Sequence, residues 1–164
     1  MGIPIKNILI ARDLSEESSK VIRYGLELGM KFHAQVHILH VMPTVDPAVL
    51  NMVAISMGAD KLAKLNATNE AALAAATRQQ LTEILQGETD LLEETMKHPP
   101  LIEVHHGEPV PTILTTADRL DADLIILGSH SKGRLHYAFL GSVAEKILKK
   151  CHRAVFIVPP LVGH

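Results

Sequence analysis

The residues with the clearest chemical potential lie in one stretch, Gly128 to Ser142. It supplies three glycines, three serines and two cations: Gly128, Gly133, Gly141, Ser129, Ser131, Ser142, Lys132 and Arg134. Glycines let the backbone approach a ligand closely, and a helix is expected to begin near Ser142. Because the free amides of a helix N-terminus attract phosphate, the stretch predicts a phosphate-binding loop.

A second candidate is Asp13, which directly follows an apolar segment expected to be a strand. A carboxylate at a strand end can accept hydrogen bonds from ribose hydroxyls or from an adenine amine. The alternative is that Asp13 only caps the helix that follows it. The chain has neither the Gly-x4-Gly-Lys-Ser/Thr of a P-loop nor a Gly-x-Gly-x-x-Gly after the first strand. P-loop hydrolases and NAD-dependent oxidoreductases are therefore disfavoured.

Five short apolar segments predict the strands that would position these residues: Asn7 to Arg12, Gln35 to Met42, Leu101 to His106, Asp123 to Gly128 and Ala154 to Pro159. Several are apolar on both alternating faces, which is typical of parallel strands covered on two sides. Helical periodicity predicts helices between them over Ser15 to Lys31, Asn69 to Lys97, Pro109 to Leu120 and Ser142 to Lys150. The alternation predicts an open, doubly wound α/β sheet, whose ligands bind outside the carboxyl ends of the strands.

One stretch, Pro43 to Asp60, does not fit this alternation and is expected to be irregular. It contains two prolines and a glycine among several large apolar residues. One interpretation is a connection packed onto the body of the protein. The other is a mobile flap over a ligand, or a surface that binds a partner.

Composition narrows the class of protein. A chain of 164 residues with 47% hydrophobic residues suits a single domain over residues 1–164. A net charge of −2, 3% aromatic residues and no tryptophan disfavour nucleic-acid binding. No apolar run approaches the length that crosses a bilayer, so membrane insertion is not expected. A single cysteine, Cys151, and the lack of an export signal indicate a reducing, cytoplasmic location.

The segment GSHSKGRLHYAFLGSVAEKILKKCHRAVFIVP resembles the C-terminal half of the universal stress protein family. NILIARDLSEESS, HHGEPVPTIL and DADLIILGSH add matches in the right order, so the resemblance covers nearly the whole chain. It implies the five-stranded parallel fold of the adenine nucleotide alpha hydrolase type, with strand order 3-2-1-4-5. It also implies a homodimer formed through the last strand, Ala154 to Val158.

One branch of this family binds ATP through Gly-x2-Gly-x9-Gly-Ser/Thr, whereas another branch lacks nucleotide. Position by position, the motif falls on Gly128, Ser131, Gly141 and Ser142, so a serine replaces the second glycine. Serine tolerates a positive φ less readily than glycine, and its side chain could crowd the phosphates or donate to them. The resemblance implies this nucleotide-binding set: Ala11, Asp13, Val41, Leu127, Gly128, Ser131, Lys132, Gly133, Gly141, Ser142 and Val143. In it Asp13 contacts the ribose or adenine, and the backbone of Val41 reads the adenine edge.

Three functions remain open. The preferred one is an ATP-binding regulatory stress-response protein, a dimeric binding module whose state is read by an unidentified protein partner. The second is a nucleotide-free dimeric interaction protein, and the third is a slow ATP hydrolase that uses Mg²⁺ to offset charge. No catalytic residue is assigned because no Gly-x-Ser-x-Gly elbow and no water-orienting residue is evident. No metal site is assigned either, although His40 and His106 could pair across neighbouring strands.

Overall fold

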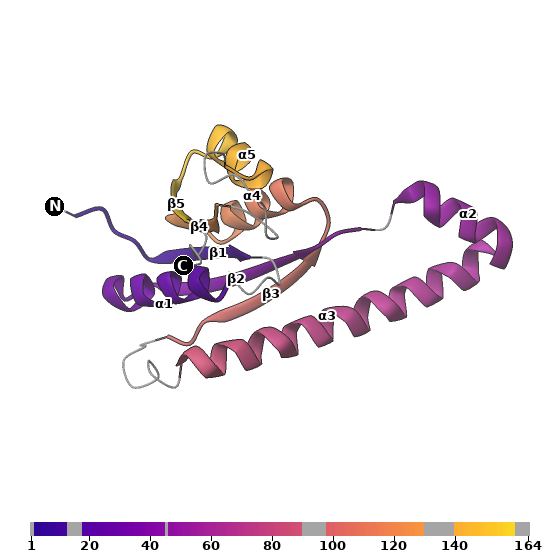
Figure 1. Ribbon diagram of the computed structural model, residues 1–164, viewed down its shortest axis with the longest axis horizontal. Coiled ribbons are helices and arrows are strands. Elements are labelled where there is room, and N and C mark those ends of the chain that lie inside the picture. The colour runs from indigo at the N-terminus through magenta and orange to yellow at the C-terminus, as the bar shows by residue number, and fades with distance from the viewer. Residues whose placement is uncertain (1, 13–17, 45, 90–97, 130–139, 160–164) are drawn as a thin grey trace, which may run out of the picture.

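Five parallel strands form one sheet in the order β3-β2-β1-β4-β5, which confirms the predicted fold class (Figure 1). The computed structural model describes residues 2–12, 18–44, 46–89, 98–129 and 140–159. The elements are β1 (Asn7–Arg12), α1 (Ser18–Phe32), β2 (Gln35–Met42), α2 (Pro47–Met57), α3 (Ala59–Thr89), β3 (Leu101–His106), α4 (Pro109–Arg119), β4 (Leu124–Gly128), α5 (Ser142–Lys150) and β5 (Ala154–Val158). Within the described residues, no helix has both the length and the hydrophobicity needed to span a bilayer.

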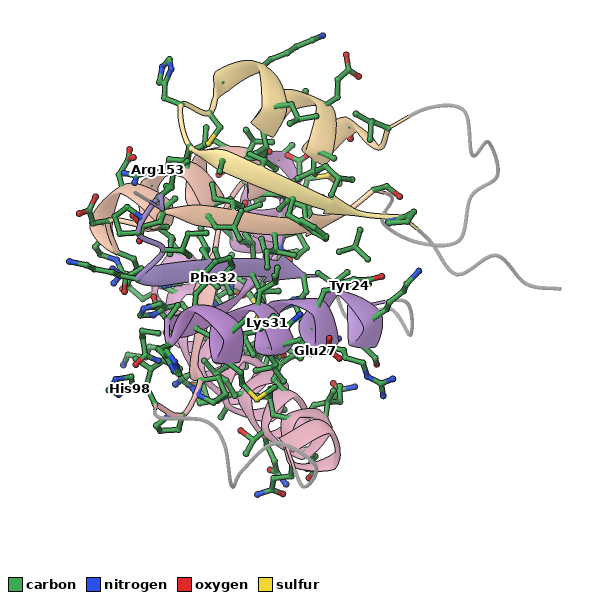
Figure 2. All side chains as sticks on the ribbon, turned by 90° about the vertical axis from the view of Figure 1, so that its left-hand side faces the viewer. Tyr24, Glu27, Lys31, Phe32, His98 and Arg153 are labelled. Atoms are coloured by element: carbon green, nitrogen blue, oxygen red, sulfur yellow. The ribbon has the colours of Figure 1, made fainter. Side chains whose placement is uncertain are left out.

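Each face of the sheet carries its own apolar cluster, because the strands alternate between two covered faces. On one face, Ile8, Ile10, Val36 and Ile38 pack with residues of α1 and α3, including Ile22, Leu26 and Leu85. On the other, Leu9, Leu39 and Ile125 pack with residues of α4 and α5, including Ile113, Ala117 and Ile147. Figure 2 shows these layers, with α5 (yellow) on one side of the sheet and α1 (violet) on the other.

Helix α1 lies very close to the sheet because two of its residues are glycines. A Cβ atom added at Gly25 would lie 2.1 Å from Cδ1 and 2.6 Å from Cγ1 of Ile10. One added at Gly29 would lie 2.4 Å from a methyl group of Val36. The two glycines therefore set the distance between α1 and strands β1 and β2.

Replacing Gly25 by alanine is expected to destabilise the fold, although alanine favours helix by about 1 kcal/mol. Overpacking against buried Ile10 costs about 1–3 kcal/mol, which outweighs that gain. Gly87 of α3 is the matched control, since a Cβ atom there meets nothing within 4 Å. Urea unfolding should show Gly25→Ala less stable and Gly87→Ala more stable than the wild type. Equal stabilisation by both substitutions would contradict the close packing of α1.

The amino end of the sheet is tied together by polar contacts. The carboxylate of Asp123 accepts hydrogen bonds from the backbone N–H groups of Lys6 at 2.7 Å and Asn7 at 2.9 Å. These two bonds lower the pKa of Asp123. Arg153 donates to the carbonyl of Ala122 at 2.6 Å and to the carboxylate of Asp118 at 3.1 Å. These contacts hold the starts of β1, β4 and β5, so the opposite end of the sheet is left for a ligand.

The structure corrects the prediction that the segment from 43 to 60 is irregular. It contains α2, and α3 begins at Ala59, well before the predicted start at Asn69. Pro47 stands in the first turn of α2, after Asp46, whose side chain accepts from the N–H of Ala48 at 2.8 Å. Proline at this position starts a helix instead of breaking one, and Gly58, with φ of 89°, separates the two helices. The predicted helix end at Lys97 falls in residues 90–97, outside the described residues.

The interpretation of this segment as a packed connection is also wrong. Helix α2 buries none of its residues. With the first part of α3 it extends beyond the carboxyl end of β2, away from both chain termini (Figure 1). Farther along, α3 returns to the sheet, where Thr77, Leu81 and Leu85 are buried.

Candidate functional site

The strand order reverses between β1 and β4, and the carboxyl ends of these two strands lie side by side. Ala11 and Leu127 are direct partners in the register, and both are buried. The chain crosses from β1 to β2 on one side, whereas β4 and β5 follow on the other. In open α/β sheets, this is the position at which ligands bind.

The start of α5 is held against the end of β4 by backbone hydrogen bonds. Ser129, which is buried, donates its N–H to the carbonyl of Val158 at 2.9 Å and accepts from the N–H of Gly141 at 2.7 Å. Gly141 is the N-cap of α5, with φ of −61° and ψ of 156°. Its connection to Ser129 places the first turn of α5 beside the carboxyl end of β4.

The first turn of α5 presents backbone donors. Gly141 has no side chain with which to cap the helix, and the first backbone bond within the helix runs from the N–H of Glu145 to the carbonyl of Gly141 at 3.0 Å. The carboxylate of Glu145 accepts from Lys149 at 2.6 Å and is exposed on the outer surface. Lys149 holds the pKa of Glu145 below its ordinary value. The helix end itself therefore offers N–H groups and partial positive charge to an anion.

Four of the predicted pocket residues meet in one apolar cluster. Ala11 and Leu127 are buried in it, and Val41 and Val143 are partly buried against it. Val41 lies one position beyond His40, which pairs with Arg12 at the end of β1. The strand ends of β1, β2 and β4 and the first turn of α5 therefore contribute to a single apolar patch beside the donors of α5.

The remaining predicted residues divide into two groups. Gly128, Gly141 and Ser142 belong to the end of β4 and the start of α5. Asp13, Ser131, Lys132 and Gly133 lie outside the described residues. The roles of these four, and the effect of serine at position 131, stay predictions.

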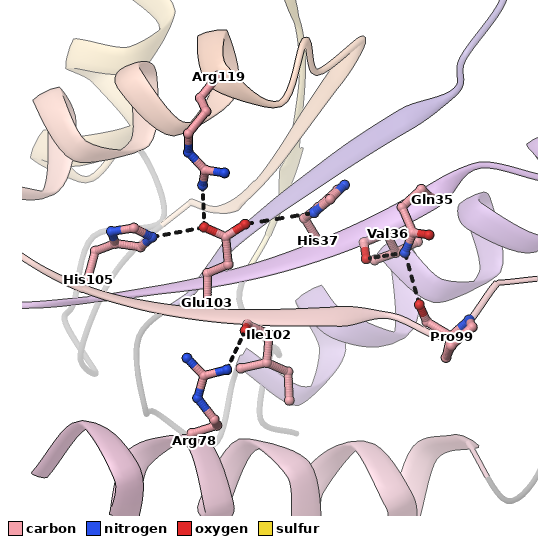
Figure 3. Close-up of polar contacts among 9 residues, drawn as sticks. All are labelled: Gln35, Val36, His37, Arg78, Pro99, Ile102, Glu103, His105 and Arg119. Carbon is pink, nitrogen blue, oxygen red and sulfur yellow. Dashed lines mark hydrogen bonds and ion pairs between the residues drawn. The ribbon is translucent and has the colours of Figure 1, made fainter. Parts of the chain in front are cut away.

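A polar cluster on β2, β3 and α4 was missed by the sequence analysis (Figure 3). The carboxylate of Glu103 forms an ion pair with Arg119 and accepts from Nε2 of His105 at 2.9 Å. Its other oxygen lies 4.0 Å from Nδ1 of His37, a buried atom without a hydrogen-bond partner among the described residues. Alternating His and Glu residues were visible in the sequence. Their meeting with Arg119 depends on strand order and helix placement.

The cluster is an ion-pair network. Within the described part of the chain, no group of three or more His, Cys, Asp or Glu side chains is arranged to hold a metal ion. Burial by itself would raise the pKa of Glu103, but the hydrogen bond from His105 and the charge and hydrogen bond of Arg119 outweigh it and lower that pKa. Burial lowers the pKa of His37 more than the charge of Glu103 raises it.

The lowered pKa of His37 predicts a loss of stability as the pH falls below about 6.5. The unfolded chain binds a proton there that the folded chain resists, so the free energy of unfolding decreases with decreasing pH. Glu103 adds a loss of the same sign only at lower pH, when its carboxylate is protonated. Urea midpoints at pH 7.5 and 5.5 should therefore differ less in His37→Gln than in the wild type. His98→Gln is the control because His98 is exposed. An unchanged difference in His37→Gln would contradict the prediction.

Comparisons with known proteins agree with this architecture. A sequence profile of the universal stress protein family matches residues 4–159. Universal stress protein MJ0531 of Methanocaldococcus jannaschii is 27% identical over 155 residues, which cover 93% of this chain and 81% of the relative. The solved structure of universal stress protein UspA from Lactobacillus plantarum superposes with a TM-score of 0.68 at 21% identity, covering 96% of this chain and 99% of that one.

Two further solved structures with similar folds were determined with nucleotides. One is a universal stress protein in complex with cAMP, with a TM-score of 0.58 and 16% identity over 96% of this chain and 98% of that one. The other is the universal stress protein from Archaeoglobus fulgidus in complex with dAMP, with a TM-score of 0.51 and 19% identity over 94% of this chain and 98% of that one.

Proposed function

The chain belongs to the universal stress protein family, and from this premise we propose that it is a regulatory protein that binds ATP at the carboxyl ends of β1 and β4. The observation that carries the proposal is the first turn of α5, which begins at a glycine and is fastened to the end of β4 beside an apolar patch. A triphosphate needs backbone donors and positive charge, and adenine needs an apolar surface with a few polar atoms. These two requirements meet at this point of the sheet.

In this proposal the phosphates bind the amides of Ser142 and Val143, which follow the N-cap Gly141 in the first turn of α5, together with the loop residues Ser131, Lys132 and Gly133. Gly128 leaves room for the backbone to approach them. The carboxylate of Asp13 accepts from the ribose or from the adenine amine. Adenine lies against Ala11, Leu127 and Val143, and the backbone of Val41 reads its edge. The cAMP and dAMP complexes of family members support an adenine nucleotide as the ligand class.

We further propose that the protein is a homodimer formed through β5. This strand is an edge of the sheet, paired only with β4 among the described strands, and such an edge is a template for another strand. Phe156 adds apolar surface there, with 37% of it exposed and its ring 5.7 Å from that of Tyr24 on α1. A cytoplasmic protein partner would read the nucleotide-bound state of this dimer.

One sequence feature favours a second function. Serine at position 131 replaces a glycine of the ATP-binding motif, and its side chain could fill the space of the phosphates. In that case the chain is a nucleotide-free dimeric interaction protein of the same fold. Both proposed functions involve a dimer, so a test of ATP binding distinguishes them and a test of dimerisation does not.

Two measurements on the purified protein test the proposal. Denatured protein should release an adenine nucleotide that is retained on an anion-exchange column, and ATP at millimolar concentration should raise the melting temperature. Ligand at 100 times its dissociation constant stabilises the native state by about 2.7 kcal/mol. GTP, which carries a different base on the same triphosphate, is the control and should raise the melting temperature less than ATP does. Absence of both released nucleotide and an ATP-dependent shift would favour the nucleotide-free function.

A further inference from the structure

Large apolar side chains are exposed along one part of the chain, here named the apolar arm, which comprises α2 and the first half of α3, residues 47–76. Its exposed apolar residues are Val49, Met52, Val53, Ile55, Met57, Leu65 and Leu73. They are half of the large apolar side chains exposed among the described residues. Exposed apolar surface of this extent is unusual for a monomer and is typical of an interaction surface.

None of the described segments of the chain covers the arm. Ile55 is 88% exposed and Met52 is 73% exposed, and α2 buries no residue at all. Leu62, near the start of α3, is buried, and α2 contacts α3, so the two helices form a helical hairpin. Leu65 and Leu73, eight residues apart, lie within about 80° of each other around α3 and so extend the apolar surface along one side.

The chain exposes more surface than a compact protein of its size. A compact monomer of 17.9 kDa is expected to expose about 8,000 Å², whereas this chain exposes 10632 Å². The exposed apolar side chains of the arm contribute to this difference.

The distribution of charge in the arm bears on which kind of molecule can cover it. Residues 47–59 carry no charged side chain, and in the whole arm two acids, Asp60 and Glu70, balance two bases, Lys61 and Lys64. Such a surface gives no attraction to anionic lipid or nucleic acid, which bind clusters of Lys and Arg. A symmetric interface brings a patch against its own copy, so a patch without charge meets no repulsion there.

We infer that the apolar arm pairs with the same arm of a second copy of this chain. Two helical hairpins then bury their apolar faces as a four-helix bundle, the arrangement in which such hairpins associate. The arm and β5 lie on opposite sides of the molecule in Figure 1, so arm pairing leaves the β5 edge open. The inference depends neither on nucleotide binding nor on the β5 dimer.

Light scattering coupled to size exclusion tests this pairing with Met52→Glu/Ile55→Glu, which places two charges in the arm. At equal protein concentration the molar mass of this variant should be half that of the wild type. Gln80→Glu/Thr115→Glu is the matched control, because it adds the same charge at exposed positions outside the arm. The control should keep the wild-type mass.

Folding of the arm variant is checked by its circular dichroism melt, which should be cooperative because both substituted side chains are largely exposed in the monomer. Equal masses for the wild type and the arm variant would overturn the inference. Wild-type protein that remains monomeric but floats with phosphatidylcholine vesicles, unlike the arm variant, would also overturn it and assign the arm to a lipid surface. In a background that disrupts the β5 edge, the arm substitutions should still halve the mass, which separates the two interfaces.

Discussion

Replacing Gly141 by valine is expected to lower the affinity for ATP about a hundredfold. The backbone at position 141 has φ of −61° and ψ of 156°, a region that valine adopts without strain. The branched side chain would instead occupy the space through which phosphate approaches the first amides of α5. Hydrogen bonds to a charged group contribute about 1.5–3 kcal/mol each, so loss of one or two gives an effect of this size. Isothermal titration calorimetry measures it directly.

Two milder substitutions at the start of α5 test whether the loss of affinity comes from the blocked approach of phosphate. Ser142→Ala removes a hydroxyl group but keeps the backbone N–H, so it should weaken ATP binding by less than about tenfold. Gly141→Ala should fall between Ser142→Ala and Gly141→Val, because its methyl group fills less of the space. Melting temperatures without ATP show whether each variant is folded. Equal ATP affinity in Gly141→Val and the wild type would exclude the start of α5 as the phosphate site.

Replacing Val155 by proline is expected to weaken the β5 dimer by about a hundredfold. Val158 accepts a hydrogen bond from the N–H of Ser129, so its backbone faces β4. Because backbone groups alternate along a strand, the N–H of Val155 faces the open edge. Two copies of one strand related by a two-fold axis are antiparallel, and proline removes a donor from each copy and adds a steric clash. Sedimentation velocity over a concentration series measures the dissociation constant.

Val155→Ala is the matched control for this edge. It removes similar packing from the partly buried side chain of Val155 but keeps the N–H, so the dimer should persist. Both variants should bind ATP, since the β5 edge lies outside the proposed nucleotide site. A dimer that tolerates Val155→Pro as well as it tolerates Val155→Ala would exclude main-chain pairing through β5.

The strands were predictable from the sequence because their signal is local. Ile8 to Ile10 and Leu124 to Leu127 are apolar on both faces, and only the centre of a covered parallel sheet buries both faces of so short a segment. The predicted bounds of β1, β2, β3 and α5 match the structure. The signal for helix α5 is equally local, since a glycine and a serine mark its start and lysines mark its end.

The apolar arm and the cluster around Glu103 could not be predicted in the same way. Pro47 and Gly58 are signals both of a loop and of helix ends, and the same apolar residues would suit a packed segment or an exposed one. A packed segment differs from an exposed one in the burial of its side chains, and that burial depends on whether other segments of the chain pack against it. Glu103 meets Arg119 and His37 because β3 lies next to β2 and α4 crosses that face of the sheet.

The amino-acid sequence by itself thus determined the parallel sheet and its family, because both depend on side chains close together along the chain. For the same reason it predicts which residues would bind a phosphate. Only the tertiary structure decided that Gly141 is fastened to Ser129, that Glu103 meets Arg119, and that α2 buries none of its residues. Contacts between distant segments follow from the packing of the whole chain, and no local pattern of residues encodes them.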